Sequence, residues 1–448
     1  MGKRNPMFYL ILPYALQQGE AAFINQYITI AGKNILSPYA TIFTDVLFFI
    51  TSGIAVFLIK VRYRRIPWVG SILIFSFALY VLVLWVTSLM NYPGGDEVFL
   101  TGRQFIYISL GYFLWIAIFQ SVTREQYEQF IKLMFYVTPV SAILYILNSA
   151  RMIPLYDSSL IYQEVNFGEQ TFLRDFRTIP LWLIPVLVLS VLSLITPSFN
   201  VSKKIVILNI IVLPVALLFT FTRSLVFIVL IQIGFLFILY ISKLNSRLTG
   251  NIILLLAFLS ISFIVIQKAF PAQSAYFQER ILSVSKEGKD EENINVRLNY
   301  VIEANRIVSE NSTFVGAGMN RAYYSRMNAI GAWIADSTIP YFLIHTGWIG
   351  VLWIFGIVFV FFTDSFFFFL KTRDWLAGYL CAFFLAVFIS SLIMGGEVLT
   401  GNVWVLANFA LYSVIKFNSW RPVERPVSHD EKQPGQEQFH RTNKSCLQ

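Results

Sequence analysis

The feature that most constrains this chain is a series of long apolar runs, separated by short polar segments, along almost its whole length. Its residues are 56% hydrophobic and only 13% charged, whereas a soluble protein carries roughly a quarter charged residues. A helix needs about 20 apolar residues to cross the hydrocarbon core of a bilayer, and many runs reach that length. Because the runs are continuous rather than alternating, they exclude a membrane β-barrel. The sequence therefore predicts an all-α, polytopic membrane protein.

Charged residues, proline and glycine divide the apolar sequence into about twelve predicted spans. The first span is the weakest, because the polar stretch 17–20 interrupts it. The seventh and eighth spans meet at the very short turn Thr222-Arg223-Ser224. The predicted spans are residues 6–28, 36–59, 67–90, 103–121, 129–148, 179–196, 204–221, 223–242, 249–267, 339–362, 375–394 and 398–415.

The distribution of Lys and Arg between the loops predicts the orientation of the spans, because cytoplasmic loops carry an excess of these residues. With a cytoplasmic N-terminus, the inward loops hold eleven Lys and Arg, whereas the short outward loops together with the segment 149–178 hold six. The long segment 268–338 is left out of this comparison, because the rule applies to short loops. Both termini are then cytoplasmic, and the segments 149–178 and 268–338 face outward. The inward residues are Lys60, Arg62, Arg64, Arg65, Arg124, Lys203, Lys204, Lys243, Arg247, Lys371 and Arg373, and the outward ones are Lys33, Arg103, Arg151, Arg174, Arg177 and Arg223.

The polar residues outside the spans exclude several kinds of function. The net charge is +9, but the positive-inside bias explains the basic residues without a nucleic-acid partner. The two cysteines, Cys381 and Cys446, form no metal motif and no disulfide framework. The chain divides into a membrane domain, residues 1–416, and a polar cytoplasmic tail, residues 417–448, which is expected to be disordered because it lacks apolar residues for a core.

The outward segment 268–338, between the ninth and tenth spans, holds most candidates for chemistry. Residues 293–310 show the apolar spacing of an amphipathic helix and are predicted to lie on the outer membrane surface. Glu303 and Arg306 on this helix fit an ordinary surface ion pair. The sequence Phe314-Val315-Gly316-Ala317-Gly318 follows, in which the glycines permit a tight turn and a close backbone approach. It is not a dinucleotide fingerprint, since no third glycine follows.

Four residues at the outward edge each have a functional and a plainer interpretation. In the functional interpretation, Arg223 and Arg297 bind phosphate oxygens, which the planar guanidinium group matches. In the plainer interpretation, Arg223 contacts lipid headgroups and Arg297 pairs with a carboxylate or faces solvent. Asp336, just before the tenth span, is a proton acceptor or only a helix N-cap. His345 lies inside that span, where an ionisable residue is a functional candidate by default, or it is a buried histidine bonded to a neighbouring helix.

The order of these features resembles the O-antigen polymerase and O-antigen ligase family of bacterial surface-polysaccharide enzymes. A Thr-Arg-Ser turn between two spans precedes a large outward loop with an Arg-Leu on a surface helix. A Phe-x-Gly-x-Gly follows, and then a polar pair that opens a helix with Gly-x-x-Gly. The resemblance covers about residues 219–355. It implies transfer of a glycan from an undecaprenyl diphosphate carrier to a hydroxyl group, with no cofactor and no obligatory metal.

The resemblance also implies roles for individual residues. Arg223 and Arg297 match the arginines that bind the diphosphate, and Arg280 is a third candidate. Ligases commonly carry His-Asn where this chain has Asp336-Ser337, so this departure favours the polymerase branch. The proton of the acceptor hydroxyl needs a carboxylate or imidazole, for which Glu303, Asp336 and His345 are candidates in no fixed order. The segment 149–178 either shapes the sugar site, through Glu164, Arg174 and Arg177, or is a solvated loop.

Three functions therefore remain open. The leading one is a repeat-unit polymerase in the bacterial cytoplasmic membrane with an extracytoplasmic active site. Its partners are the lipid-linked oligosaccharide and membrane lipid, and a chain-length regulator is an optional partner. The second is a ligase that transfers the finished glycan to a lipid or protein acceptor. The third is a transporter or flippase, which the absence of an internal repeat disfavours.

Overall fold

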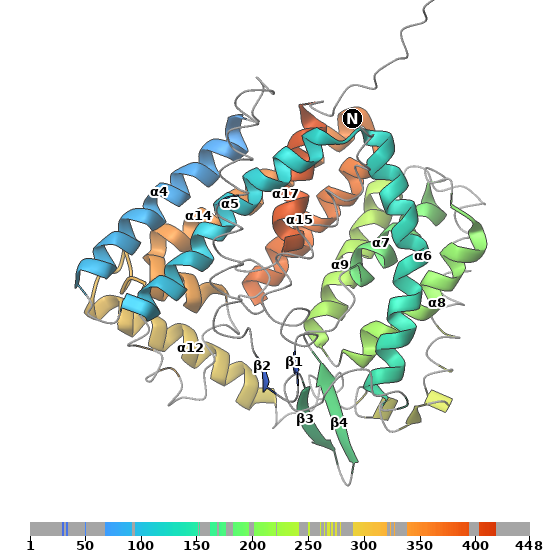
Figure 1. The fold of residues 1–448 in the computed structure, drawn as a ribbon, viewed down its shortest axis with the longest axis horizontal. Coiled ribbons are helices and arrows are strands. Elements are labelled where there is room, and N and C mark those ends of the chain that lie inside the picture. Colours follow the sequence, from blue (N-terminus) through green and yellow to red (C-terminus); the bar gives the residue numbers. More distant parts are fainter. Residues whose placement is uncertain are drawn as a thin grey trace, which may run out of the picture.

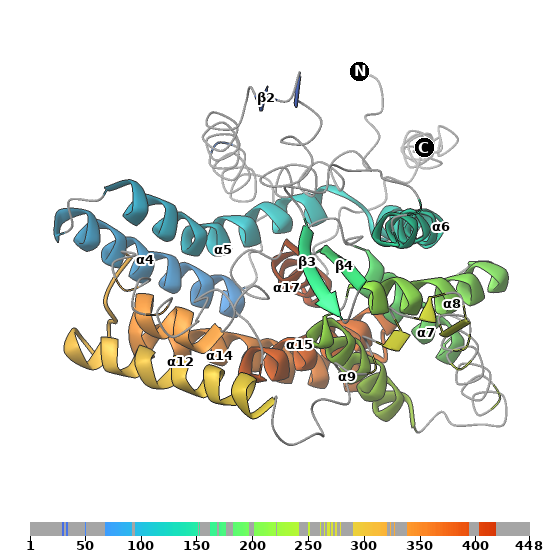
Figure 2. The same ribbon diagram turned by 90° about the horizontal axis from the view of Figure 1, so that it is seen from below.

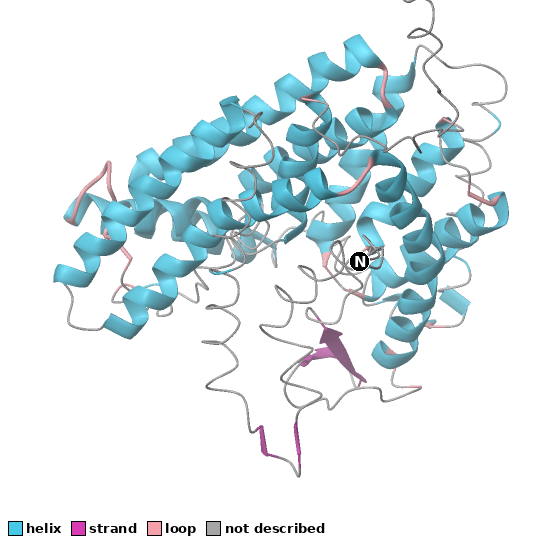
Figure 3. Cartoon of the chain, turned by 45° about the horizontal axis from the view of Figure 1, so that its top comes forward, coloured by secondary structure: helices cyan, strands magenta, loops and turns pink. Residues whose placement is uncertain are grey.

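The structure is a computed structural model of the 448-residue chain. It describes residues 29–30, 33–34, 50, 68–91, 95–150, 152, 162–167, 170–175, 182–196, 201–220, 222–241, 290–319, 338–393 and 403–417, with single residues and pairs between 250 and 278 and at 323 and 327. Within these ranges the chain is predominantly helical, with two short antiparallel hairpins (Figures 1 and 3).

The elements follow one another in a mostly helical order. The hairpin strands are β1 (Thr29–Ile30), β2 (Lys33–Asn34), β3 (Tyr162–Phe167) and β4 (Gln170–Asp175). The helices are α4 (Trp68–Asn91), α5 (Gly95–Ser121), α6 (Arg124–Ser149), α7 (Leu183–Ile195), α8 (Lys203–Phe219), α9 (Arg223–Tyr240), α12 (Asp290–Glu310), α14 (Thr338–Thr372), α15 (Trp375–Ile393) and α17 (Val403–Lys416).

The length and apolar character of the helices agree with the predicted membrane class. Among the described residues, four helices are long and apolar enough to cross a membrane, and four shorter apolar helices accompany them. The four long ones are Gly70–Asn91, Arg124–Ser149, Thr338–Thr372 and Trp375–Leu392. Every predicted span from 67–90 to 223–242, and each of the last three, corresponds to a helix. The predicted spans 6–28, 36–59 and most of 249–267, and the tail after residue 417, lie outside the described residues.

Two predicted segments differ from what the structure contains. The span predicted at 339–362 is a longer helix, α14, which runs to Thr372, because no proline or glycine follows Gly356 to end it. It is also interrupted near its start, where Gly347 has non-helical φ and ψ angles of 62° and −168°. The outward segment 149–178, predicted as a loop, contains the β3–β4 hairpin, in which Tyr162 pairs with Asp175.

The helices pack into two groups that meet along α15. α14 packs against α15, α4 and α12, and α5 packs against α4 and α17, whereas α6, α7 and α8 pack against one another and α9 packs against α15 (Figure 2). Aromatic side chains fill the first group: the rings of Phe77 and Trp353 stack at 3.9 Å, and Phe361 and Phe409 meet edge to face at 4.4 Å. Such ring pairs stabilise helix contacts beyond the area that they bury.

One end of the bundle is held together by charged side chains. Arg124, at the start of α6, binds Asp374 in a bidentate pair with N–O distances of 2.9 and 2.8 Å. Asp374 also accepts a hydrogen bond from the Leu376 amide and so caps α15. The α5–α6 and α14–α15 connections therefore meet at one end of the bundle. The Lys and Arg distribution assigns both connections to the same side of the membrane.

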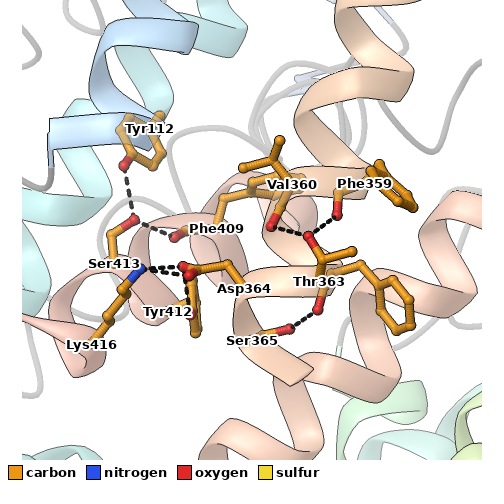
Figure 4. Close-up of polar contacts among 11 residues, drawn as sticks. Tyr112, Phe359, Val360, Thr363, Asp364, Ser365, Phe409, Tyr412, Ser413 and Lys416 are labelled. Atoms are coloured by element: carbon orange, nitrogen blue, oxygen red, sulfur yellow. Dashed lines mark hydrogen bonds and ion pairs between the residues drawn. The ribbon is translucent and has the colours of Figure 1, made fainter. Parts of the chain in front are cut away.

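A second charged contact joins α14 to α17 near that end. The Lys416 ammonium lies 2.5 and 2.6 Å from the two carboxylate oxygens of Asp364, and the Tyr412 hydroxyl donates to the same carboxylate at 2.8 Å (Figure 4). Next to it, the Tyr112 and Ser413 hydroxyls lie 2.9 Å apart, which ties α5 to α17. No sequence pattern singles out Asp364, because it stands alone in an apolar run.

We expect Asp364→Ala to lower the free energy of unfolding by about 1–2 kcal/mol, because it removes one hydrogen bond and one partly exposed ion pair. Thr363→Ala is the matched control, since the Thr363 hydroxyl bonds only to carbonyls of its own helix among the contacts in Figure 4. Thermal unfolding in detergent measures both variants. Equal effects of the two substitutions would show that the contact between α14 and α17 contributes nothing to stability.

Candidate functional site

The turn that follows α12 docks on the break in α14. The Ala317 amide donates to the Ile344 carbonyl at 2.7 Å, on one side of the break. On the other side, the Trp348 and Ile349 amides donate to the carbonyls of Thr313 and Phe314, both at 3.2 Å. The backbone groups that a continuous helix would pair internally are therefore paired with residues 312–319, which we call the docking turn.

Glycines make this close approach of two backbones feasible. Gly316 has a φ of +81°, and a Cβ there would lie 2.6 Å from the Gly347 nitrogen. At Gly347 a Cβ would lie 2.2 Å from the Phe314 oxygen. The expectation that the Gly-x-Gly permits a tight turn and close backbone approach is confirmed, and its neighbour is α14. Gly350, four residues after Thr346, also belongs to this tight region, because a Cβ there would collide with the Thr346 hydroxyl.

Helix α4 supports the docking turn and the break from the side. The Met319 amide donates to the Ser88 hydroxyl at 2.9 Å, and the Tyr80 hydroxyl donates to the Thr346 carbonyl at 2.7 Å. A Cβ at Gly318 would lie 2.6 Å from the same Ser88 oxygen. Sequence reasoning missed Ser88 and Tyr80, and their only signal is a polar group within an otherwise apolar span.

His345 lies two residues before the break and is fully buried. Its Nδ1 lies 2.8 Å from the Gly318 carbonyl oxygen. Because a carbonyl only accepts, Nδ1 carries the proton in this contact. The ring lies edge-on against Tyr341, at 5.0 Å, and Phe105, at 5.9 Å. The plainer interpretation of His345, a buried histidine bonded to a neighbouring segment, therefore matches its surroundings.

Helix α12 lies along α14 with one buried face. That face consists of Tyr300, Ala304, Ile307 and Val308, each no more than 5% exposed. Position 297 lies on the same helix, three residues before Tyr300. The predicted surface helix is confirmed as a helix, with bounds within three residues of the prediction.

The charged residues Glu303 and Arg306 form the contacts expected of a surface helix. Arg306 is 67% exposed and lies 3.9 Å from Glu303 and 3.4 Å from Glu310. Exposed pairs of this kind contribute little to stability. Glu303 thus contacts Arg306 while His345 contacts Gly318, so these two proton-acceptor candidates have different partners.

Arg223 is the first residue of α9. The other end of α9 is fixed by Tyr240, whose ring lies 5.2 Å from that of Phe369 near the end of α14. α9 has 18 residues, a length of about 27 Å, so Arg223 lies about that far from the contact between Tyr240 and Phe369. Figure 1 shows α12, the β3–β4 hairpin and the corresponding end of α9 on the lower side of the bundle.

The hairpin at this end carries two of the predicted sugar-site residues. Glu164 lies in β3 opposite Leu173, and Arg174 lies in β4 opposite Gln163. β4 contacts α6. Three predicted site residues, Arg177, Arg280 and Asp336, lie outside the described residues.

What the described residues can do chemically follows from their types. They contain no group of three or more His, Cys, Asp or Glu that could hold a metal ion. The described elements include two arginine positions on separate helices, α9 and α12, a hairpin with an acidic and a basic residue, and the backbone joint at Gly347. Arginines on separate elements suit a polyanionic group held between them. No family model and no curated protein matches the chain.

Proposed function

We propose that this protein is a polysaccharide repeat-unit polymerase, a membrane glycosyltransferase that uses a polyprenyl-diphosphate-linked glycan. The observation that carries the proposal is that α12, the β3–β4 hairpin and the lower end of α9 lie on the same side of an apolar helix bundle (Figure 1). These three elements hold Arg223, Arg297, Glu164 and Arg174, which are far apart in the sequence. A lipid-linked substrate would keep its tail beside the apolar helices and its charged head at this end.

The reaction needs cations where the leaving diphosphate gains negative charge. Guanidinium groups held on helices supply such stabilisation without reorganising during the reaction. In our proposal Arg223 and Arg297 bind the diphosphate, and Arg280 extends this cluster. A carboxylate, Glu303 or Asp336, takes the proton of the acceptor hydroxyl as the new glycosidic bond forms and the carrier diphosphate leaves.

The proposal includes the subcellular localisation and the membrane topology of the protein. The protein resides in the bacterial cytoplasmic membrane with about twelve spans, cytoplasmic termini and the site on the outer face. The bond between Arg124 and Asp374 supports this topology, because it joins two connections that the Lys and Arg distribution assigns to the cytoplasm. The docking turn and Arg223 lie toward the opposite end, which agrees with an outward site.

The test is polymer formation by purified protein in detergent with a polyprenyl-diphosphate-linked oligosaccharide as the only substrate. A polymerase produces a ladder of products that differ by one repeat unit, and it releases one carrier diphosphate for each bond formed. Transfer of a preformed glycan to an added lipid or protein acceptor, without a ladder, would identify a ligase instead. Neither product from correctly folded protein would reject the enzyme assignment.

The break in α14 raises a second candidate, a lipid-linked glycan flippase. Broken helices are common in transporters, where the freed backbone groups bind substrate or ions. In this chain, however, residues 312–319 and Tyr80 occupy the carbonyls of Ile344 and Thr346 and the amides of Trp348 and Ile349. This pairing favours a structural joint over a transport site. Movement of a labelled lipid-linked glycan across sealed vesicles, with no ladder in detergent, would support the flippase.

A further inference from the structure

We infer that His345 is a positioning residue, which holds the docking turn and thereby helix α12 in place through its Nδ1–H bond to the Gly318 carbonyl. The inference concerns the same site, and its consequence for activity rests on the proposed polymerase function. It assigns His345 a different role from proton transfer. Its structural part can be tested without any substrate.

The first step is the chemistry of the bond. Nδ1 donates to Gly318 at 2.8 Å, and the ring is fully buried between Tyr341 and Phe105. A group that transfers a proton to or from a sugar must approach within hydrogen-bond reach of it. A ring closed in by aromatic side chains and tied to the backbone suits a fixed cross-link better than such an approach.

The second step is that this bond belongs to a larger joint. The docking turn is bonded to α14 through the Ala317, Trp348 and Ile349 amides, and to α4 through Ser88. His345 adds a bond to Gly318, which lies between Ala317 and Met319, the two residues whose amides are bonded to α14 and α4. A set of hydrogen bonds that converges on one short turn restrains it far more than any single bond would.

The third step connects the joint to α12. This helix ends at Glu310, immediately before the docking turn, and packs along α14 through Ala304 and Val308. Any shift of the turn relative to α14 therefore shifts the end of α12. Position 297 lies on the same helix, so the joint sets where this arginine stands relative to Arg223 on α9.

The experiment compares two substitutions of nearly equal shape. Asn places its Nδ2 the same number of bonds from Cα as Nδ1 of histidine, so His345→Asn keeps the donor to Gly318 but removes the titratable ring. His345→Leu has the shape of Asn without any donor. Amide hydrogen exchange over residues 312–319 and 344–349, measured by mass spectrometry on the full chain in nanodiscs, reports the joint directly. Polymer formation and its pH dependence report the site.

We expect His345→Asn to keep the slow exchange of the wild-type protein, and to make polymer with an unchanged pH dependence. We expect His345→Leu to exchange about tenfold faster over the docking turn and to make shorter polymer. Ser88→Ala serves as a second variant, because it removes the bond between the Met319 amide and α4 and leaves His345 unchanged. We expect faster exchange over residues 312–319 in this variant.

Two outcomes would overturn the inference. Unchanged exchange in His345→Leu would show that the bond does not hold the turn. Slow exchange together with lost polymer in His345→Asn would show that His345 acts by proton transfer. A wild-type protein that makes no polymer would reject the proposed function, while the exchange comparison would still decide whether His345 positions the turn.

Discussion

Arg297→Ala is expected to reduce the rate of polymer formation by about 100- to 1,000-fold, because a preorganised donor aimed at developing charge contributes on that scale. α12 packs one face along α14, and position 297 lies on this helix, three residues before the buried Tyr300. Its loss should leave the leaving diphosphate without one of two guanidinium groups. The measurement is the initial rate of repeat addition by purified protein at saturating lipid-linked substrate.

Arg306→Ala is the matched control on the same helix. Arg306 is 67% exposed and contacts only acidic side chains of α12 among the ion pairs of the described residues. Its removal should change the rate less than twofold, because exposed pairs contribute little. A loss in Arg306→Ala as large as that in Arg297→Ala would attribute the effect to the helix rather than to position 297.

Arg223→Ala should produce a loss of the same size, and the double variant should be little worse than either single one. Residues that act on one group as a unit are strongly non-additive, since removing either already abolishes their joint effect. Arg297→Lys should recover only part of the rate, because lysine keeps the charge but loses the planar fork that matches phosphate. Independent, multiplying losses at positions 223 and 297 would argue against a shared diphosphate.

The second large effect is expected on stability. Gly347→Ala should lower the free energy of unfolding by about 2–4 kcal/mol, since φ 62° and ψ −168° is a region that residues other than glycine rarely occupy. A Cβ at this position would also lie 2.2 Å from the Phe314 oxygen. The docking turn would have to move away, and the bonds from the Trp348 and Ile349 amides would be lost with it. Thermal unfolding in detergent measures the change.

Gly356→Ala is the control within the same helix. A Cβ at Gly356 meets no atom within 4 Å, and alanine is favoured over glycine inside a helix by about 1 kcal/mol. This variant should therefore be as stable as the wild-type protein or slightly more so. If Gly347→Ala matched it, the break in α14 would carry no strain that requires glycine, and α14 would tolerate straightening.

Much of the helical architecture could be predicted from the sequence because it depends on local properties. The apolar run near residues 67–90 became α4, and the spacing of Leu298, Val301 and Val308 correctly predicted α12. The predicted span 339–362 ends ten residues before α14 does, and the residues beyond it include Asp364, whose carboxylate Lys416 and Tyr412 bind. The apolar pattern of one segment contains no information about partners on another helix, such as Lys416 and Tyr412 on α17.

The candidate site was predictable in part for the same reason. Arginines next to apolar runs are conspicuous, so Arg223 and Arg297 were found as residue types with a suitable chemistry. Ser88 and Tyr80 could not be found, because a serine or tyrosine in an apolar span usually only bonds to its own helix or packs at the interface. Their partners, the Met319 amide and the Thr346 carbonyl, are backbone groups that no side chain reveals.

The sequence alone determined that this protein is a membrane-embedded helical bundle and where most of its described helices run. Hydropathy and charge decide both, and each can be read one segment at a time. Only the tertiary structure decided that α14 breaks at Gly347 and that the docking turn fills the break. The reason is physical: the groups unpaired by a broken helix must find partners, and here those partners lie about thirty residues away in the chain, brought close by folding.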